Sequence, residues 1–227
     1  MPFLPIASHI SDIQIGLWRI EEPEEYYMQS LNLYENEQRH LAKIIHPQKR
    51  LEWLSSRLCL KTLLNIRRKV ESLNNSQGKP YLSDNSHFIS YSHSTHYAAA
   101  VASKNGEVAI DIEMFRKRRS PETAKMFMDE YELAAFENSQ NMYLFFLIWS
   151  AKETLFKVYG KRGIYFRENI HINIEDFTLK QNGKVSGYVQ YENYERYYEI
   201  VYEIFSDFIL TYTFGGMQQP QVGSLNC

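Results

Sequence analysis

Two acidic residues near the middle of the chain have the spacing of metal ligands on a strand. Residues 109–113 read Ala-Ile-Asp-Ile-Glu, so Asp111 and Glu113 alternate with Ile110 and Ile112. Residues two apart on a strand share a face, so both carboxylates point one way while the isoleucines point into a core. Two neighbouring carboxylates suit a hard divalent cation such as Mg²⁺, which prefers oxygen ligands. Taken alone, the pair is also compatible with a solvated strand face.

A third carboxylate falls in a helical segment further along the chain. Residues 149–157 read Trp-Ser-Ala-Lys-Glu-Thr-Leu-Phe-Lys, which places Glu153 and Lys157 one helical turn apart on one face. We expect Glu153 to be a third ligand of the metal. We expect Lys152 and Lys157 to hold the phosphates that the metal bridges. The simpler alternative is an exposed Glu–Lys pair of ordinary helical spacing.

Two polar segments precede these acids. Residues 90–94 read Ser-Tyr-Ser-His-Ser after a predicted strand, so Ser92 and His93 offer hydroxyl and imidazole donors to an anion. Further upstream, Gly and Pro fix a turn that presents Lys79. Each feature has a structural alternative, namely a histidine that caps a turn and a lysine on a surface loop. The helical segment before them adds the cations Arg50, Arg57 and Lys61.

Together these segments predict a site with three acids for a metal and several cations for a polyphosphate. The sequence has no Walker-type loop and no Gly-x-Gly-x-x-Gly turn, which argues against nucleoside triphosphates and dinucleotides as ligands. It also has no Gly-x-Ser-x-Gly motif, so a serine hydrolase of that kind is not indicated.

The elements that must position these residues follow from periodicity and turn signals. Apolar residues at helical spacing predict helices, and alternation predicts strands. Turn-rich segments are residues 74–80 and 104–106, a hairpin turn is expected at 181–184, and a basic loop at 115–120. The expected helices are 47–68, 121–136 and 142–159, the last ended by Gly160. The expected strands are 13–20, 87–91, 97–102, 108–113 and several within 170–214.

This order of elements predicts an α+β fold with one long helix and one small sheet in each of two halves. The expected halves are residues 1–108 and 109–214, followed by a flexible polar tail at 215–227. A chain of 227 residues is long enough for two such units. The sequence shows no strong internal repeat, so the two-fold organisation depends on the pattern of elements.

Composition narrows the class of partners. The formal net charge is −2, which disfavours duplex nucleic acid as a main partner. The two cysteines, Cys59 and Cys227, form neither a disulfide framework nor a zinc-binding spacing, so we expect a reducing compartment. No apolar run is long enough to span a bilayer, and no signal peptide is evident. We therefore expect a cytoplasmic protein with no membrane association.

The four motifs, in this order and spacing, resemble the Sfp-type 4′-phosphopantetheinyl transferases over residues 45–165. One difference is that the family often has Gly where this chain has Ala109. The resemblance implies a pseudo-dimer of two similar halves with the active site in the cleft between them. It implies Mg²⁺ held by Asp111, Glu113 and Glu153; Mn²⁺ could take its place, since both ions accept oxygen ligands. It implies coenzyme A as the substrate, contacted by Arg50, Arg57, Lys79, Pro80, Ser92, His93, Lys152 and Lys157.

The same resemblance implies a reaction. A serine of an apo acyl or peptidyl carrier protein would attack coenzyme A, accept the phosphopantetheine group and release adenosine 3′,5′-bisphosphate. Glu153 or a polarised water would take the serine proton, and Lys157 would stabilise charge on the pyrophosphate. Lys117, Arg118 and Arg119 are candidates for docking an acidic carrier protein. Since both halves are fused in one chain, we expect a monomer.

Two other functions are compatible with part of this pattern. A different metal-dependent nucleotide phosphotransferase or hydrolase would share the acids and cations, but would not account for the order of the upstream motifs. A non-catalytic module that binds carrier proteins would be favoured if a metal-binding acid were missing. All three acids are present.

Overall fold

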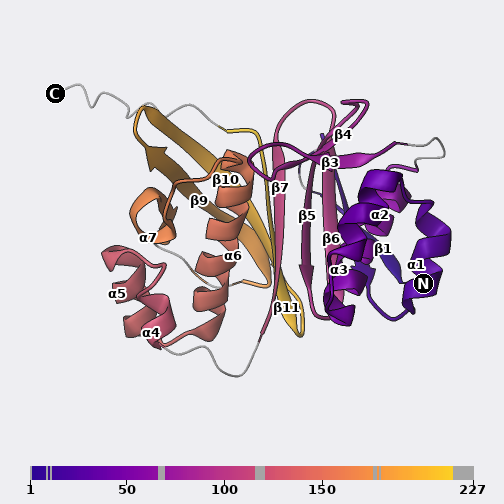
Figure 1. The fold of residues 1–227 in the computed structure, drawn as a ribbon. Helices are drawn as coiled ribbons and strands as arrows, with labels where there is room; N and C mark the ends of the chain where they lie inside the picture. The colour runs from indigo at the N-terminus through magenta and orange to yellow at the C-terminus, as the bar shows by residue number, and fades with distance from the viewer. Residues whose placement is uncertain are drawn as a thin grey trace.

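The computed structural model describes residues 2–8, 10, 12–65, 70–115, 121–175, 178 and 180–216. Within these ranges the chain forms two antiparallel sheets with helices on their outer sides (Figure 1). The predicted α+β class is therefore confirmed. The N-terminal sheet has six strands and the C-terminal sheet has five. No described helix is both long and apolar enough to cross a membrane.

The N-terminal sheet is covered by one long helix, α3 (Pro47–Leu63). Alternate alanines decide how it packs: Ala98, Ala100 and Ala102 face α3, while the intervening residues face the other sheet. The small side chains let the helix approach the sheet closely. Two shorter helices, α1 (Glu24–Leu31) and α2 (Glu35–Ala42), precede it. The strands are β1 (Phe3–Ile6), β2 (Ile13–Arg19), β3 (Ser72–Asn74), β4 (Pro80–Leu82), β5 (Phe88–Ser94) and β6 (Tyr97–Ser103), in the order β1-β2-β6-β5-β4-β3.

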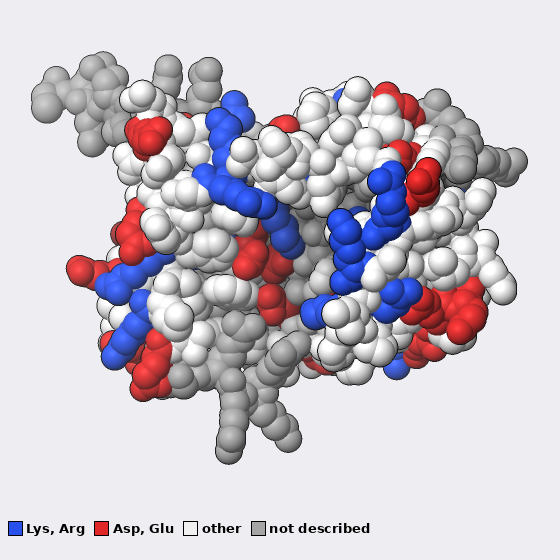
Figure 2. All heavy atoms as spheres, viewed as in Figure 1, with Lys and Arg blue, Asp and Glu red and all other residues white. Residues whose placement is uncertain are grey.

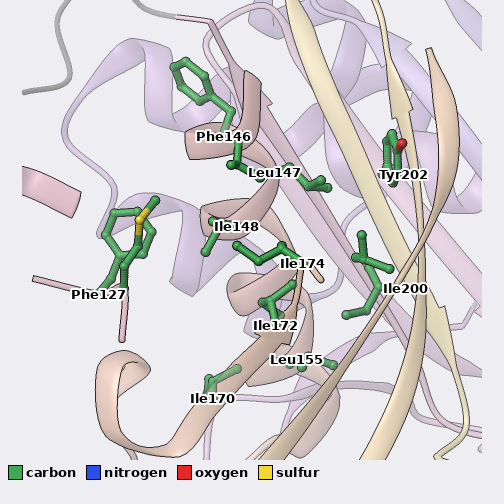
Figure 3. Close-up of a cluster of buried hydrophobic side chains, with 14 of the residues drawn as sticks. Phe127, Phe146, Leu147, Ile148, Leu155, Ile170, Ile172, Ile174, Ile200 and Tyr202 are labelled. Carbon is green, nitrogen blue, oxygen red and sulfur yellow. The ribbon is translucent and has the colours of Figure 1, made fainter. Parts of the chain in front are cut away.

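The C-terminal sheet packs against α6 (Met142–Tyr159), which is apolar on almost every side and correspondingly buried. Figure 3 shows Leu147, Ile148 and Leu155 of this helix clustered with Ile172 and Ile200 of the sheet. The strands are β7 (Val108–Met114), β8 (Ile170–Asn173), β9 (Asn182–Tyr191), β10 (Tyr194–Ile204) and β11 (Phe208–Phe214), in the order β7-β11-β10-β9-β8. The remaining helices are α4 (Pro121–Ala124), α5 (Glu130–Ser139) and α7 (Phe166–Asn169).

A third apolar cluster joins the two sheets. Ile110 and Ile112 of β7 pack there with Val101 of β6 and with Leu210 of β11. Because side chains alternate along β7, burying these isoleucines turns Asp111 to the opposite face, toward β5 and α6. The core between the sheets thus determines the direction of this acid.

Two element predictions were wrong. The helix predicted over 121–136 is divided, because the Asp129 side chain accepts a hydrogen bond from the Glu132 backbone N–H and starts α5 anew. Three of the four residues of the turn predicted at 181–184 belong to strand β9, where Gly183 pairs with Tyr202. A Cβ on Gly183 would lie 2.7 Å from the Tyr202 hydroxyl oxygen, so this glycine makes room for a ring. The tight turn lies instead between Tyr191 and Tyr194.

Other boundaries differ in smaller ways. Helix α3 ends at Leu63, earlier than predicted, and the sequence analysis missed β1 and α2. The candidate docking residues Lys117, Arg118 and Arg119 lie outside the described residues, as does most of the segment 215–227. The last strand of the first sheet ends at Ser103 and the first strand of the second begins at Val108. The proposed division into halves at 108/109 stays a prediction.

Candidate functional site

A cavity of about 510 Å³ is lined by residues from both parts of the chain. In Figure 2 the surface is hollowed near its centre, with acidic atoms beside the hollow and Lys or Arg on both flanks. From the C-terminal part the lining includes Asp111, Glu113, Glu153, Phe156 and Lys157. From the N-terminal part it includes His40, Trp53, Arg57, Lys79, Pro80, Ser92 and His93. The structure therefore brings together most of the residues predicted from sequence.

Asp111 is the most enclosed of the three acids, with 3% of its surface exposed. Its Oδ1 accepts hydrogen bonds from Ser92 Oγ at 2.9 Å and Lys157 Nζ at 2.8 Å. Its Oδ2 accepts one from Ser150 Oγ at 2.8 Å. A buried carboxylate needs such partners, since an isolated buried charge is costly. These contacts hold Asp111 in one orientation at the edge of the cavity.

Glu113 and Glu153 approach the same cavity from β7 and α6. Trp149, one turn before Glu153 on α6, donates from Nε1 to Glu113 Oε1 at 2.7 Å. This bond links strand and helix beside the acids. It also gives Trp149 a role as an orienting donor, which the sequence analysis had not assigned.

The three acids fit a divalent cation in chemical kind, because all are oxygen donors that line one cavity. Their arrangement is not a closed ligand set. Within the described ranges, no three His, Cys, Asp or Glu side chains lie close enough to hold a metal ion. The Lys157 ammonium contacts Asp111 Oδ1 directly, where a bound cation would compete with it. The same ammonium donates to the Ile110 carbonyl at 3.0 Å.

The structure places Lys152 away from the cavity, contrary to the prediction. It was predicted to hold phosphates, but its side chain has 0% exposure and does not line the cavity. Its Nζ donates to the carbonyls of Phe127, Phe166 and Ile170 and pairs with Glu132 at 2.6 Å. Burial lowers the pKa of Lys152 and raises that of Glu132, and each charge opposes the shift of the other. Lys152 therefore connects α6 to α5 and to the segments that carry Phe127, Phe166 and Ile170.

Ser92 and His93 lie at the cavity with different surroundings. The Ser92 hydroxyl donates to Asp111 and accepts from the Ile112 backbone N–H at 3.2 Å, so it ties β5 to β7. The His93 Nδ1 lies 3.0 Å from Glu52 Oε2. Burial lowers the pKa of His93, while the Glu52 carboxylate opposes that shift. Of the two, His93 has the side chain that is open to the cavity, with 38% exposed.

Lys79 joins the two parts of the chain at the rim of the cavity. Its Nζ pairs with Glu107 and donates to the Val158 carbonyl at 3.1 Å, in the last turn of α6. Gly160, which ends α6 with φ +67°, lies directly beneath the lysine stem. A Cβ there would lie 2.6 Å from Lys79 Cδ, so this glycine meets both a backbone and a packing requirement.

Arg50 also differs from its prediction as a coenzyme A contact, because it does not line the cavity. Its Nε and Nη2 donate to both carboxylate oxygens of Glu24, at 2.8 and 2.5 Å. Its Nη1 donates to the carbonyls of Leu41 and Ile44. The arginine holds α1 and the end of α2 against α3, and all of its nitrogens donate to protein acceptors. Its predicted contact with coenzyme A therefore loses support.

Arg57 does line the cavity, and its guanidinium lies 3.6 Å from the centre of the Trp53 ring. Burial lowers its pKa, although an arginine remains charged. The His40 ring stacks on Trp53 at 5.4 Å and also lines the cavity. The sequence analysis missed His40 and Trp53. The spacing of Trp53 and Arg57, one turn apart on a helix, was the available signal.

Comparison with known proteins points to one superfamily. Residues 107–213 match the model of the 4′-phosphopantetheinyl transferase superfamily. This region contains β7 and α6, which carry the three acids and Lys157. This match to the C-terminal part of the chain agrees with the resemblance to the Sfp-type enzymes noted from the sequence.

Three curated relatives agree with this assignment. HetI of Nostoc sp. strain PCC 7120, named a 4′-phosphopantetheinyl transferase, is 29% identical over 76% of this chain and 78% of its own. The protein slr0495 of Synechocystis sp. strain PCC 6803, to which the same name is given provisionally, is 31% identical over 51% of this chain and 52% of its own. AcpT of Salmonella typhimurium, another named 4′-phosphopantetheinyl transferase, is 33% identical over 49% of this chain and 60% of its own. The match thus spans about half the length of slr0495 and more of HetI.

Proposed function

We propose that the protein transfers the 4′-phosphopantetheine group of coenzyme A to a serine of an apo acyl or peptidyl carrier protein and releases adenosine 3′,5′-bisphosphate. One observation carries the proposal. Asp111, Glu113, Glu153 and Lys157 converge on a single cavity whose opposite side carries Arg57 and other cations. Acids beside cations suit a substrate whose phosphates are held partly through a metal ion. The names of the relatives support the same activity.

Each side of the cavity has a distinct role in this proposal. Asp111, Glu113 and Glu153 would hold Mg²⁺, or Mn²⁺ in its place. When bound, the ion would neutralise charge on the pyrophosphate. Lys157 would exchange its contact with Asp111 for a phosphate oxygen and stabilise charge as the phosphate bond breaks. Arg57, Lys79 with Pro80, and His93 would contact the nucleotide end of coenzyme A.

Ser92 takes a supporting role, because its hydroxyl is used in orienting Asp111. A serine hydroxyl of the carrier protein is a weak nucleophile at neutral pH and needs a base. Glu153 lines the cavity on the same helix as Lys157, so its carboxylate would accept the serine proton. We further propose that the two halves form a pseudo-dimer with the active site in the cleft between them. The protein would be a cytoplasmic monomer, and the carrier protein would dock beside the cavity.

The ligand is tested by thermal unfolding with coenzyme A or ATP, each with Mg²⁺. A ligand that binds the folded state raises the melting temperature by an amount that grows with the logarithm of its concentration divided by its Kd. Coenzyme A should protect at concentrations where ATP has little effect, since the proposal assigns the cavity to coenzyme A. Equal protection by both would favour a different nucleotide-dependent enzyme.

The roles of the acids and Lys157 are tested by substitution. Asp111→Ala should abolish turnover, because it removes a metal ligand and the partner of Lys157. Lys157→Ala should lower kcat more than it raises KM for coenzyme A. Near-normal turnover in Asp111→Ala, or an effect of Lys157→Ala on KM alone, would contradict these roles. Glu35→Ala, an exposed change on α2, serves as the control.

A further inference from the structure

Glu52 is a buried acid that contacts His93, a residue of the cavity lining. It is 2% exposed and lies on α3. Its Oε2 lies 3.0 Å from His93 Nδ1 and accepts a hydrogen bond from Lys49 Nζ at 2.7 Å. Among the described residues, Glu52 is not part of the cavity lining, whereas His93 is. The carboxylate thus acts on the cavity through the imidazole.

This contact determines which ring nitrogen of His93 carries the hydrogen. A carboxylate oxygen accepts hydrogen bonds, so Nδ1 is the donor in the His93–Glu52 contact. In a neutral imidazole the other nitrogen, Nε2, then has a lone pair and no hydrogen. A lone pair repels a phosphate oxygen. The ring therefore becomes a donor to an anion at Nε2 only when it takes up a proton.

The other charges around His93 act in opposite directions. Lys49 and Arg57 on α3 and Lys157 on α6 lower its pKa, as does burial, whereas Glu52 raises it. In the free protein, burial and these cations hold the pKa of His93 below its ordinary value, which favours the neutral ring. A phosphate group in the cavity would add negative charge and favour the imidazolium. The ring is placed to change its charge when an anion binds.

We propose that Glu52 is a positioning residue that makes coenzyme A binding proton-linked: it holds His93 in the Nδ1–H form, so that a phosphate of coenzyme A is bound by the imidazolium with uptake of one proton. This inference rests on the proposed function. It concerns a residue that contacts the imidazole and not the substrate. It also predicts that affinity for coenzyme A falls as the pH rises above neutrality.

The test is calorimetric titration of coenzyme A into the protein at pH 7.5, in buffers that differ in ionisation enthalpy. The wild type should take up a substantial fraction of a proton, up to about one, for each coenzyme A bound. Glu52→Gln should take up much less, because a glutamine amide can donate to Nδ1 and allow a neutral ring with hydrogen on Nε2. Lys49→Met keeps the His93–Glu52 contact but removes a cation that lowers the pKa of His93, so it should still take up more than Glu52→Gln, although less than the wild type. The exposed change Glu35→Gln should behave as wild type.

Coenzyme A binding to the wild type without proton uptake would overturn the inference and leave the proposed function standing. The same uptake in Glu52→Gln would also overturn it, since the proton would then go to another group such as His40. Failure of coenzyme A to bind the wild type would count against both proposals. If Glu52→Gln does not fold, ¹⁵N chemical shifts of the His93 ring in the free wild-type protein decide: Nδ1–H is expected, and Nε2–H would refute the inference. Titration of 3′-dephospho-coenzyme A identifies the phosphate, because uptake is lost if His93 binds the 3′-phosphate and kept if it binds the pyrophosphate.

Discussion

Replacing Lys152 with methionine should destabilise the fold strongly. Methionine approximates the length of the lysine stem but removes the ammonium group. The Glu132 carboxylate, also fully buried, would lose its partner, and three backbone carbonyls would lose a donor. Removing one member of a buried ion pair costs about 3–5 kcal/mol. Natural domains have a total stability of about 5–15 kcal/mol, so the loss is a large part of it.

Urea unfolding followed by tryptophan fluorescence measures this loss. With slopes of about 3 kcal/mol per molar urea for a chain of this size, the midpoint should fall by on the order of 1 M. Lys184→Met is the matched control, because its pair with Glu199 is about half exposed. It should change the free energy of unfolding by less than about 0.5 kcal/mol.

A double variant separates an unpaired charge from a loss of packing. Glu132→Gln removes the charge and keeps an acceptor for the Ile172 N–H. Added to Lys152→Met, it should restore part of the stability, with a coupling of about 1–3 kcal/mol. The reasoning is refuted if Lys152→Met unfolds at the wild-type midpoint. If coenzyme A affinity in that variant also falls tenfold, the original prediction of a phosphate contact would be reinstated.

Two further predictions concern a residue of α3 and the glycine that ends α6. Arg50→Gln should cost about 1 kcal/mol, since its pair with Glu24 is partly exposed, and should change coenzyme A affinity less than twofold. The hydrogen bond from Arg50 lowers the pKa of Glu24. The stability that the Arg50–Glu24 pair contributes is therefore present above the ordinary pKa of 4.5 and is lost as the pH falls through the lowered value. Urea unfolding should show the stabilities of wild type and variant converging in acid, and a difference that stays constant with pH would contradict the assignment. Gly160→Ala should destabilise by more than about 1 kcal/mol, and by more than Gly78→Ala, because both glycines have positive φ but only Gly160 lies against Lys79. Equal thermal shifts in the two variants would show that the Lys79 contact has little weight.

The parts of the site that follow from local periodicity were predictable from the sequence. The bounds of α6 agree with its apolar pattern, the Asn141 cap and Gly160. The alternation in β7 correctly assigned Ile110 and Ile112 to the core and Asp111 to the opposite face. Both patterns involve neighbours within one element, so no tertiary information was needed.

The roles of the cations were not predictable in the same way. Lys152 and Glu153 are adjacent, and consecutive residues on a helix point about 100° apart, so one can be buried where the other lines the cavity. Since α6 is apolar on almost every side, its sequence does not show which flank is covered. The partners of Lys152 and Arg50, Glu132 and Glu24, lie on other elements. Their positions depend on tertiary packing.

The central claim is transfer of phosphopantetheine, and intact-protein mass spectrometry tests it most directly. The protein is incubated with Mg²⁺, coenzyme A and an apo acyl or peptidyl carrier protein, and the carrier is weighed. We expect a gain of one phosphopantetheine group on the carrier, abolished by chelation of the metal and by replacing the acceptor serine of the carrier with alanine. No gain with carriers of either kind, although coenzyme A binds, would contradict the account and indicate a non-catalytic protein.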